Sequence, residues 1–89
     1  MPHPLVVHRK DPHDVYIGRP SRWGNPYVIG RDGTREEVIA KHRAALELRM
    51  RFDPSLRATI IAELGGKRLG CHCAPSPCHG DFLAEVANP

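Results

Sequence analysis

The 89-residue sequence contains few aromatic side chains and no long hydrophobic run. Aromatic residues make up 6% of the chain, against 40% for all hydrophobic residues, so aliphatic side chains must form most of any core. No apolar run approaches the roughly 20 residues that a membrane-spanning helix needs. The run at residues 5–7 is too short for the hydrophobic part of a signal peptide. We therefore expect a cytoplasmic protein with no membrane partner.

Runs of like charge are also missing. Lysine and arginine number 13 against 10 acidic residues, a net charge of +3, but no five basic residues follow one another. This pattern fits either a solvated basic surface or a surface that binds an anionic partner. Cysteine is scarce as well, and three cysteines cannot all pair within one chain. Because the cytoplasm disfavours disulfides, we interpret the cysteines as thiols or metal ligands.

Proline and glycine, by contrast, are plentiful and cluster at residues 19–26 and 75–80, which predicts two shaped loops. Short β-branched runs bounded by Pro, Asp and Gly predict strands at 5–8 and 15–17, and one further short strand at 27–29. Strict alternation over 67–73 predicts another strand.

Helical signals fill the remaining chain. Thr34 and Glu37 form a capping box in front of apolar residues at helical spacing, which predicts a helix over 35–51. Asp53 and Pro54 begin a second helix that ends before the glycines at 65–66, and a short helix follows over 82–87. Since a chain of this length supports one core, the sequence predicts a single α/β domain over residues 1–89. We expect a small mixed sheet of three or four strands packed with three helices.

The chemistry-bearing residues gather at 71–81, where a predicted strand is followed by a proline-rich turn and a helix. Ligands of open α/β sheets bind at the carboxyl ends of strands, and a helix N-terminus offers free N–H groups and a positive dipole to an anion. Cys78 and His79 are therefore candidates for a nucleophile and an acid/base. Gly80 would let a ligand approach the backbone, and Asp81 would contact the ligand or complement the helix dipole.

Other interpretations of this segment remain open. Cys71, Cys73, Cys78 and His79 are ligand types that zinc prefers, although their spacing lacks the usual widely separated pairs. The cysteines would otherwise be small buried hydrophobes, with His79 holding the loop by a hydrogen bond. A partner-binding surface without chemistry is the remaining alternative.

The second candidate segment is the proline-bounded loop at residues 19–26. Its polar and aromatic members are Arg19, Ser21, Arg22, Trp23 and Asn25. The two arginines would clamp phosphate oxygens, and the tryptophan would either stack on a nucleobase or anchor the core. The asparagine, which precedes a proline, would bind the ligand or stabilise a turn.

Four motifs in these segments resemble the DUF4326 family. They are DVYIGRPSRWGNP at 14–26, GTREE at 33–37, GKRLGCHCAP at 66–75 and PCHGD at 77–81. The family occurs in bacteriophages and bacteria and has no established activity, so the resemblance implies a phage or prophage setting and no particular reaction. Its members commonly carry tryptophan where this chain has His72, which argues against His72 as an essential metal ligand.

Taken together, the motifs predict one pocket in which residues 19–26 meet residues 71–81. We expect it to bind a phosphate-bearing ligand, a nucleotide or a nucleic-acid end, without a cofactor, and whether it catalyses a reaction stays open. One alternative is a zinc-stabilised binding module. The other is a phage protein that binds a host protein through its basic surface.

Overall fold

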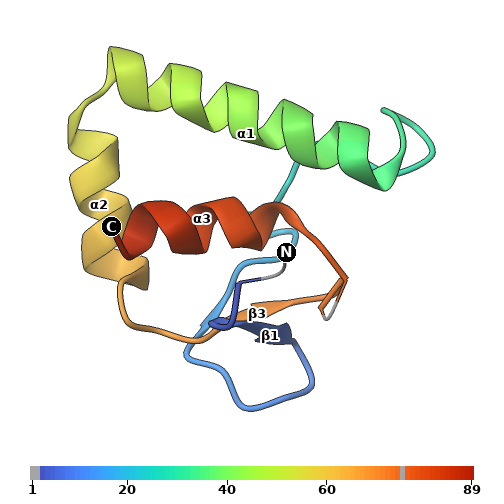
Figure 1. The fold of residues 1–89 in the computed structure, drawn as a ribbon, viewed down its shortest axis with the longest axis horizontal. Helices are drawn as coiled ribbons and strands as arrows, with labels where there is room; N and C mark the ends of the chain where they lie inside the picture. Colours follow the sequence, from blue (N-terminus) through green and yellow to red (C-terminus); the bar gives the residue numbers. More distant parts are fainter. Residues whose placement is uncertain (1–2, 75) are drawn as a thin grey trace.

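The computed structural model describes residues 3–74 and 76–89, so Pro75 of the predicted proline-rich turn lies outside the described residues. Along the chain the elements are β1 (Val6–His8), β2 (Val15–Tyr16), α1 (Arg35–Phe52), α2 (Ser55–Leu64), β3 (Leu69–Cys71) and α3 (His79–Ala87). The predicted α/β class with three helices is confirmed. Figure 1 shows α3 between α1 and the small sheet, with α2 along one end of the molecule.

The sheet has the strand order β1-β3-β2, with β3 in the centre. Both outer strands are parallel to β3, and Leu69 pairs with Val6 on one side and Val15 on the other. The sheet is therefore wholly parallel, where a mixed sheet was expected. All three strands consequently place their carboxyl ends at the same edge.

The fourth strand expected at 27–29 is reduced to a single bridge between Ile29 and Gly33. The chain reverses direction here, since Gly30 and Gly33 have φ values of 90° and 141° and the N–H of Gly30 donates to the Gly33 carbonyl. Residues other than glycine rarely adopt such φ values. The segment is thus a tight turn that leads into α1.

The capping box at the start of α1 forms as predicted. The Glu37 N–H donates to Thr34 Oγ1 at 3.3 Å, and the Thr34 N–H donates to Glu37 Oε1 at 2.9 Å. Four side chains at every fourth position of this helix are buried: Val38, His42, Leu46 and Met50. The spacing places them on one face, which is the face that packs toward the rest of the domain.

Helix α3 packs against the most buried part of the core. Leu83 and Ala84 on α3 are fully buried, as are Ile60 and Leu64 on α2. Gly80 allows the close approach of α3 to the sheet, because a Cβ at this position would collide with the side chain of Ile17. The glycine that was expected to admit a ligand therefore admits a core side chain.

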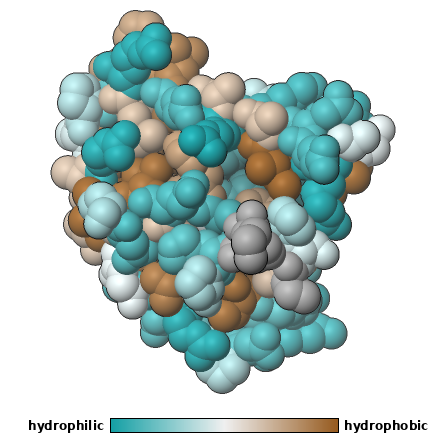
Figure 2. Space-filling model, in the orientation of Figure 1, coloured by the Kyte–Doolittle hydropathy of each residue, from teal (hydrophilic) through white to brown (hydrophobic). Residues whose placement is uncertain are grey.

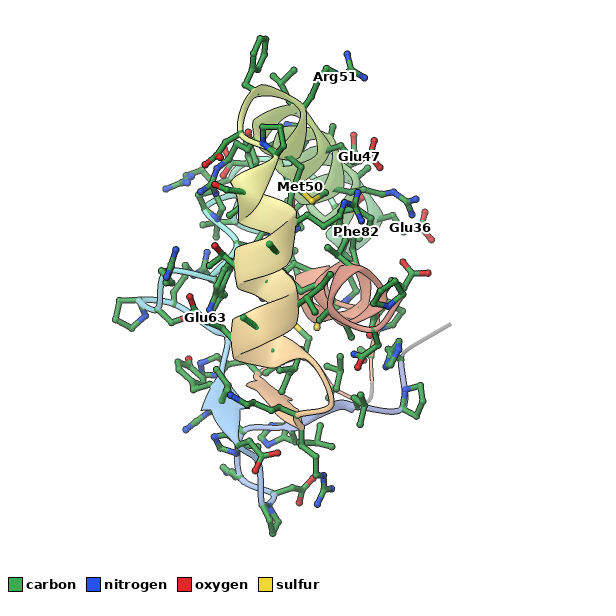
Figure 3. All side chains as sticks on the ribbon, turned by 90° about the vertical axis from the view of Figure 1, so that its left-hand side faces the viewer. Glu36, Glu47, Met50, Arg51, Glu63 and Phe82 are labelled. Atoms are coloured by element: carbon green, nitrogen blue, oxygen red, sulfur yellow. The ribbon has the colours of Figure 1, made fainter. Side chains whose placement is uncertain are left out.

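Apolar side chains outside the core are scattered. The face in Figure 2 is mainly hydrophilic, with separate apolar patches, and Figure 3 shows Met50 and Phe82 where α1 and α3 meet. None of the helices in the described part of the chain has both the length and the apolar character that crossing a membrane requires.

Candidate functional site

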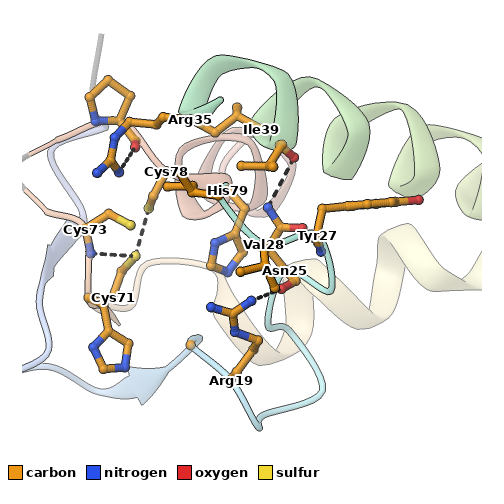
Figure 4. A pocket seen from close by; sticks show the side chains of 15 residues that line it. Arg19, Asn25, Tyr27, Val28, Arg35, Ile39, Cys71, Cys73, Cys78 and His79 are labelled. Carbon is orange, nitrogen blue, oxygen red and sulfur yellow. Dashed lines mark hydrogen bonds between the residues drawn. The ribbon is translucent and has the colours of Figure 1, made fainter. Parts of the chain in front are cut away.

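A cavity of about 270 Å³ lies at the carboxyl ends of β2 and β3 (Figure 4). Its walls come from the segment after β2, the first turns of α1 and the segment from β3 to α3. The lining residues are Gly18, Arg19, Asn25, Tyr27, Val28, Ile29, Arg35, Val38, Ile39, Cys71, His72, Cys73, Pro77, Cys78 and His79. The structure therefore brings parts of the two predicted segments together at the edge of the sheet where ligands of parallel α/β folds bind.

Cys78 and Asp81 build the N-terminus of α3 at one wall of this cavity. Cys78 is the N-cap residue, and its Sγ accepts the Gly80 N–H at 3.3 Å. The Asp81 carboxylate accepts the N–H of Cys78 at 3.1 Å and that of His3 at 2.9 Å. Asp81 is thus occupied as a helix cap, and it does not belong to the lining of this cavity.

Two buried thiols lie side by side here, with Cys71 Sγ 2.9 Å from Cys78 Sγ. The hydrogen bond from Cys78 lowers the pKa of Cys71 from 9.0 to about 5 in spite of burial, and the Cys73 N–H adds to this effect. The same contact, together with burial, raises the pKa of Cys78 above its usual value. The pair therefore loses one proton readily, because a second anionic sulfur beside the first is unfavourable.

The thiolate favoured by these contacts is on Cys71, which the sequence suggested as a metal ligand or a small buried hydrophobe. Cys78, the candidate nucleophile, holds its proton more tightly and uses its sulfur as the helix cap. No local pattern distinguishes the two cysteines in this respect, since the difference arises from their mutual contact.

His79 is buried next to this pair. Its Nε2 lies 2.8 Å from the carbonyl oxygen of Ile17, and its ring meets the His42 ring edge-on with centroids 5.1 Å apart. Because a carbonyl oxygen only accepts hydrogen bonds, Nε2 carries the proton and Nδ1 the free lone pair. A ring nitrogen of His79 and the sulfurs of Cys71 and Cys78 all lie within 4.8 Å of one another, so this cluster has the composition and spacing to hold a metal ion. Cys73 lines the cavity but is not part of the cluster.

Two arginines face the cavity from different elements. Arg19 Nη1 donates to the Asn25 carbonyl at 3.4 Å, and Arg35 Nη1 donates to the Pro77 carbonyl at 3.2 Å. Neither guanidinium has a carboxylate partner among the residues that the structure describes. Arg35 lies outside the two segments that were predicted to form the pocket. Its place in the first turn of α1 was predictable, but the direction of its side chain was not.

Two of the remaining loop residues, Arg22 and Trp23, have structural contacts. Trp23 is 6% exposed and belongs to the core. The Arg22 guanidinium lies 4.6 Å from the centre of the Trp23 ring and pairs with Glu63 at 3.0 Å. Ser21 does not line the cavity either. Of the five predicted loop residues, only Arg19 and Asn25 do so.

Asn25 also organises the loop. Its Nδ2 donates to the Val38 carbonyl at 3.2 Å, and its Oδ1 accepts the Tyr27 N–H at 2.9 Å. These two bonds connect the loop to α1 and hold Tyr27 at the cavity. The expectation that Asn25 stabilises a turn therefore has a structural counterpart.

The chain matches one family model and is similar to a phage protein. The model of DUF4326, a domain of unknown function, matches residues 6–89. An uncharacterised 12.4 kDa protein from the nrdA–td intergenic region of Enterobacteria phage T4 is 39% identical over 85 residues, which cover 94% of this chain and 76% of the phage protein. No solved structure matches the chain.

Proposed function

This chain belongs to the DUF4326 family, and from its own site we propose that it binds a phosphate-bearing ligand, a nucleotide or a nucleic-acid end. The observation that carries the proposal is the pair of guanidiniums of Arg19 and Arg35, which, within the part of the chain that the structure describes, hydrogen-bond only to backbone carbonyls. Guanidiniums bind phosphate oxygens through charge-assisted, often bidentate hydrogen bonds. Both arginines line the cavity, and Figure 4 shows them on either side of Cys78 and His79.

The fold supports an anion at this place in two further ways. The cavity lies at the carboxyl ends of parallel strands, and α3 begins at its wall with a positive dipole end. Its volume of about 270 Å³ is at the lower limit of common ligand pockets, roughly 300–1,000 Å³. A mononucleotide or one terminal phosphorylated residue fits this size better than a dinucleotide. The phage T4 relative suggests a phage setting, in which the ligand would come from the host cytoplasm.

Thermal unfolding with a panel of ligands tests the proposal. The panel contains inorganic phosphate, a nucleoside, its mono-, di- and triphosphates, and a short oligonucleotide with and without a 5′-phosphate. We expect phosphorylated members to raise the midpoint and the unphosphorylated nucleoside to leave it unchanged, because only binding to the native state stabilises.

Substitution of each arginine sharpens the test. Arg19→Ala and Arg35→Ala should each weaken binding by about 10- to 100-fold, the effect of losing one or two hydrogen bonds to a charged group. Arg68→Ala is the matched control, because this exposed arginine precedes β3 at the end opposite the cavity. No shift with any phosphorylated compound, or an equal loss in the control, would show that the cavity is not a phosphate site.

A further inference from the structure

We infer that Cys71, Cys78 and His79 form a binding site for a zinc ion whose fourth coordination position opens into the cavity. The three side chains come from the end of β3 and the first residues of α3, and all three are buried. Two thiols and an imidazole within 4.8 Å of one another are the donor types that zinc prefers. This inference goes beyond the proposed function and does not depend on it.

The hydrogen bonding of His79 is that of a metal ligand. Metal-bound histidines usually donate their second ring N–H to a carbonyl or carboxylate, which fixes the ring and directs the other nitrogen to the ion. Here Nε2 bonds the Ile17 carbonyl at 2.8 Å, and Ile17 itself is completely buried. The imidazole is therefore held in one orientation through Nε2, and Nδ1 makes no hydrogen bond among the described residues.

The distances require only a small adjustment. Two sulfurs bound to one tetrahedral zinc at about 2.3 Å lie about 3.8 Å apart. Cys71 Sγ and Cys78 Sγ are 2.9 Å apart, so binding would separate them by about 1 Å. Rotation of the two cysteine side chains would provide a movement of this size.

The number of ligands indicates an open site. Structural zinc sites have four protein ligands, whereas sites with an accessible position have three. Cys73, which would complete a closed site of four, lies outside the cluster. Because Cys71, Cys78 and His79 all line the cavity, the free position faces it. A small domain also gains stability from an ion that connects a strand to a helix.

Metal analysis of the full chain, expressed without a histidine tag and purified under reducing conditions, tests the inference. We expect one zinc per chain. Replacement by cobalt should give strong visible bands of a four-coordinate ion and a thiolate-to-cobalt band in the near ultraviolet. Cys78→Ser should lose the ion and still fold, since serine is a good N-cap residue. Cys71→Ser should also lose the ion.

Two controls make the result decisive. Cys73→Ser should retain one zinc per chain, and so should Arg35→Ala, which separates the metal site from the proposed phosphate site. The inference would be overturned if the purified wild-type protein contained no zinc and the cobalt-treated protein showed none of these absorption bands. An equal loss of metal in Cys73→Ser, or a Cys71–Cys78 disulfide found by mass spectrometry in the purified protein, would also overturn it.

Discussion

At the scale of single residues, His42 is a buried imidazole on the inner face of α1. Its Nδ1 has no hydrogen-bond partner among the described residues. Burial lowers the pKa of His42 from 6.5 to about 4, and the positive charge of Arg49 on α1 acts in the same direction. The folded protein therefore resists protonation at this site.

This residue predicts an acid-sensitive stability. Between pH 6.5 and about 4 the unfolded chain binds a proton at His42 that the folded chain does not, so the free energy of unfolding falls as the pH is lowered through this window. The loss reaches up to about 3 kcal/mol at the lower end. In His42→Leu this part of the decrease should disappear, with no loss of stability at neutral pH.

Urea denaturation of both proteins at several pH values, in the presence of a chelator, measures the difference. The chelator removes any metal bound to the neighbouring His79, so that metal binding does not contribute to the pH dependence of the free energy of unfolding. Parallel stability curves for wild type and His42→Leu would contradict the assignment of the acid effect to this histidine.

At the scale of elements, α3 is the helix on which the site depends. It supplies buried apolar residues to the core, and its N-terminus forms a wall of the cavity. The Asp81 carboxylate holds this end in place, because it joins the helix to the N–H groups of Cys78 and His3. The cap thus connects the helix to the segment that precedes β1.

Loss of the Asp81 cap should destabilise the N-terminus of α3. Asp81→Ala removes both hydrogen bonds, and we expect the free energy of unfolding to fall by about 1–2 kcal/mol, as for other N-terminal caps. Glu85→Ala is the matched control, since Glu85 is exposed one turn further along α3. Urea denaturation compares the two variants, and equal stabilities would show that the Asp81 bonds add nothing.

At the scale of the whole molecule, the core is continuous from the sheet to α2. Leu69 on β3, Leu64 on α2 and Leu83 on α3 are fully buried in one cluster. No element holds a separate core among the described residues. Small domains of this kind unfold in a single cooperative transition.

Leu83→Ala tests this cooperativity. The cavity it leaves should cost about 2–5 kcal/mol, a large fraction of the stability of a small domain. Leu48→Ala should change stability by less than about 0.5 kcal/mol, because Leu48 is 50% exposed. Fluorescence of the buried Trp23 and far-ultraviolet circular dichroism should report the same transition, and separate transitions would indicate independently folding parts.

Local patterns in the sequence predicted most of the elements and the family. The capping box of α1 links residues three positions apart, so its signal is complete within one turn. The same holds for the end of α2 before Gly65 and for the motifs that resemble DUF4326. The segment at 27–29 failed as a strand because its pairing among the described residues is limited to the local Ile29–Gly33 bridge across the turn of Gly30 and Gly33, and strand pairing with a distant segment is not written in local spacing.

The composition of the site was decided by tertiary contacts. Arg19 and Arg22 are three residues apart in one loop, yet only Arg19 lines the cavity, because Glu63 and the buried Trp23 hold Arg22 elsewhere. In the same way Cys71 contacts Cys78, whereas Cys73 lies outside the cluster. The sequence by itself determined which residue types each segment offers. The directions of their side chains depended on packing between segments far apart in the chain, and the local spacing of residues carries no information on that packing.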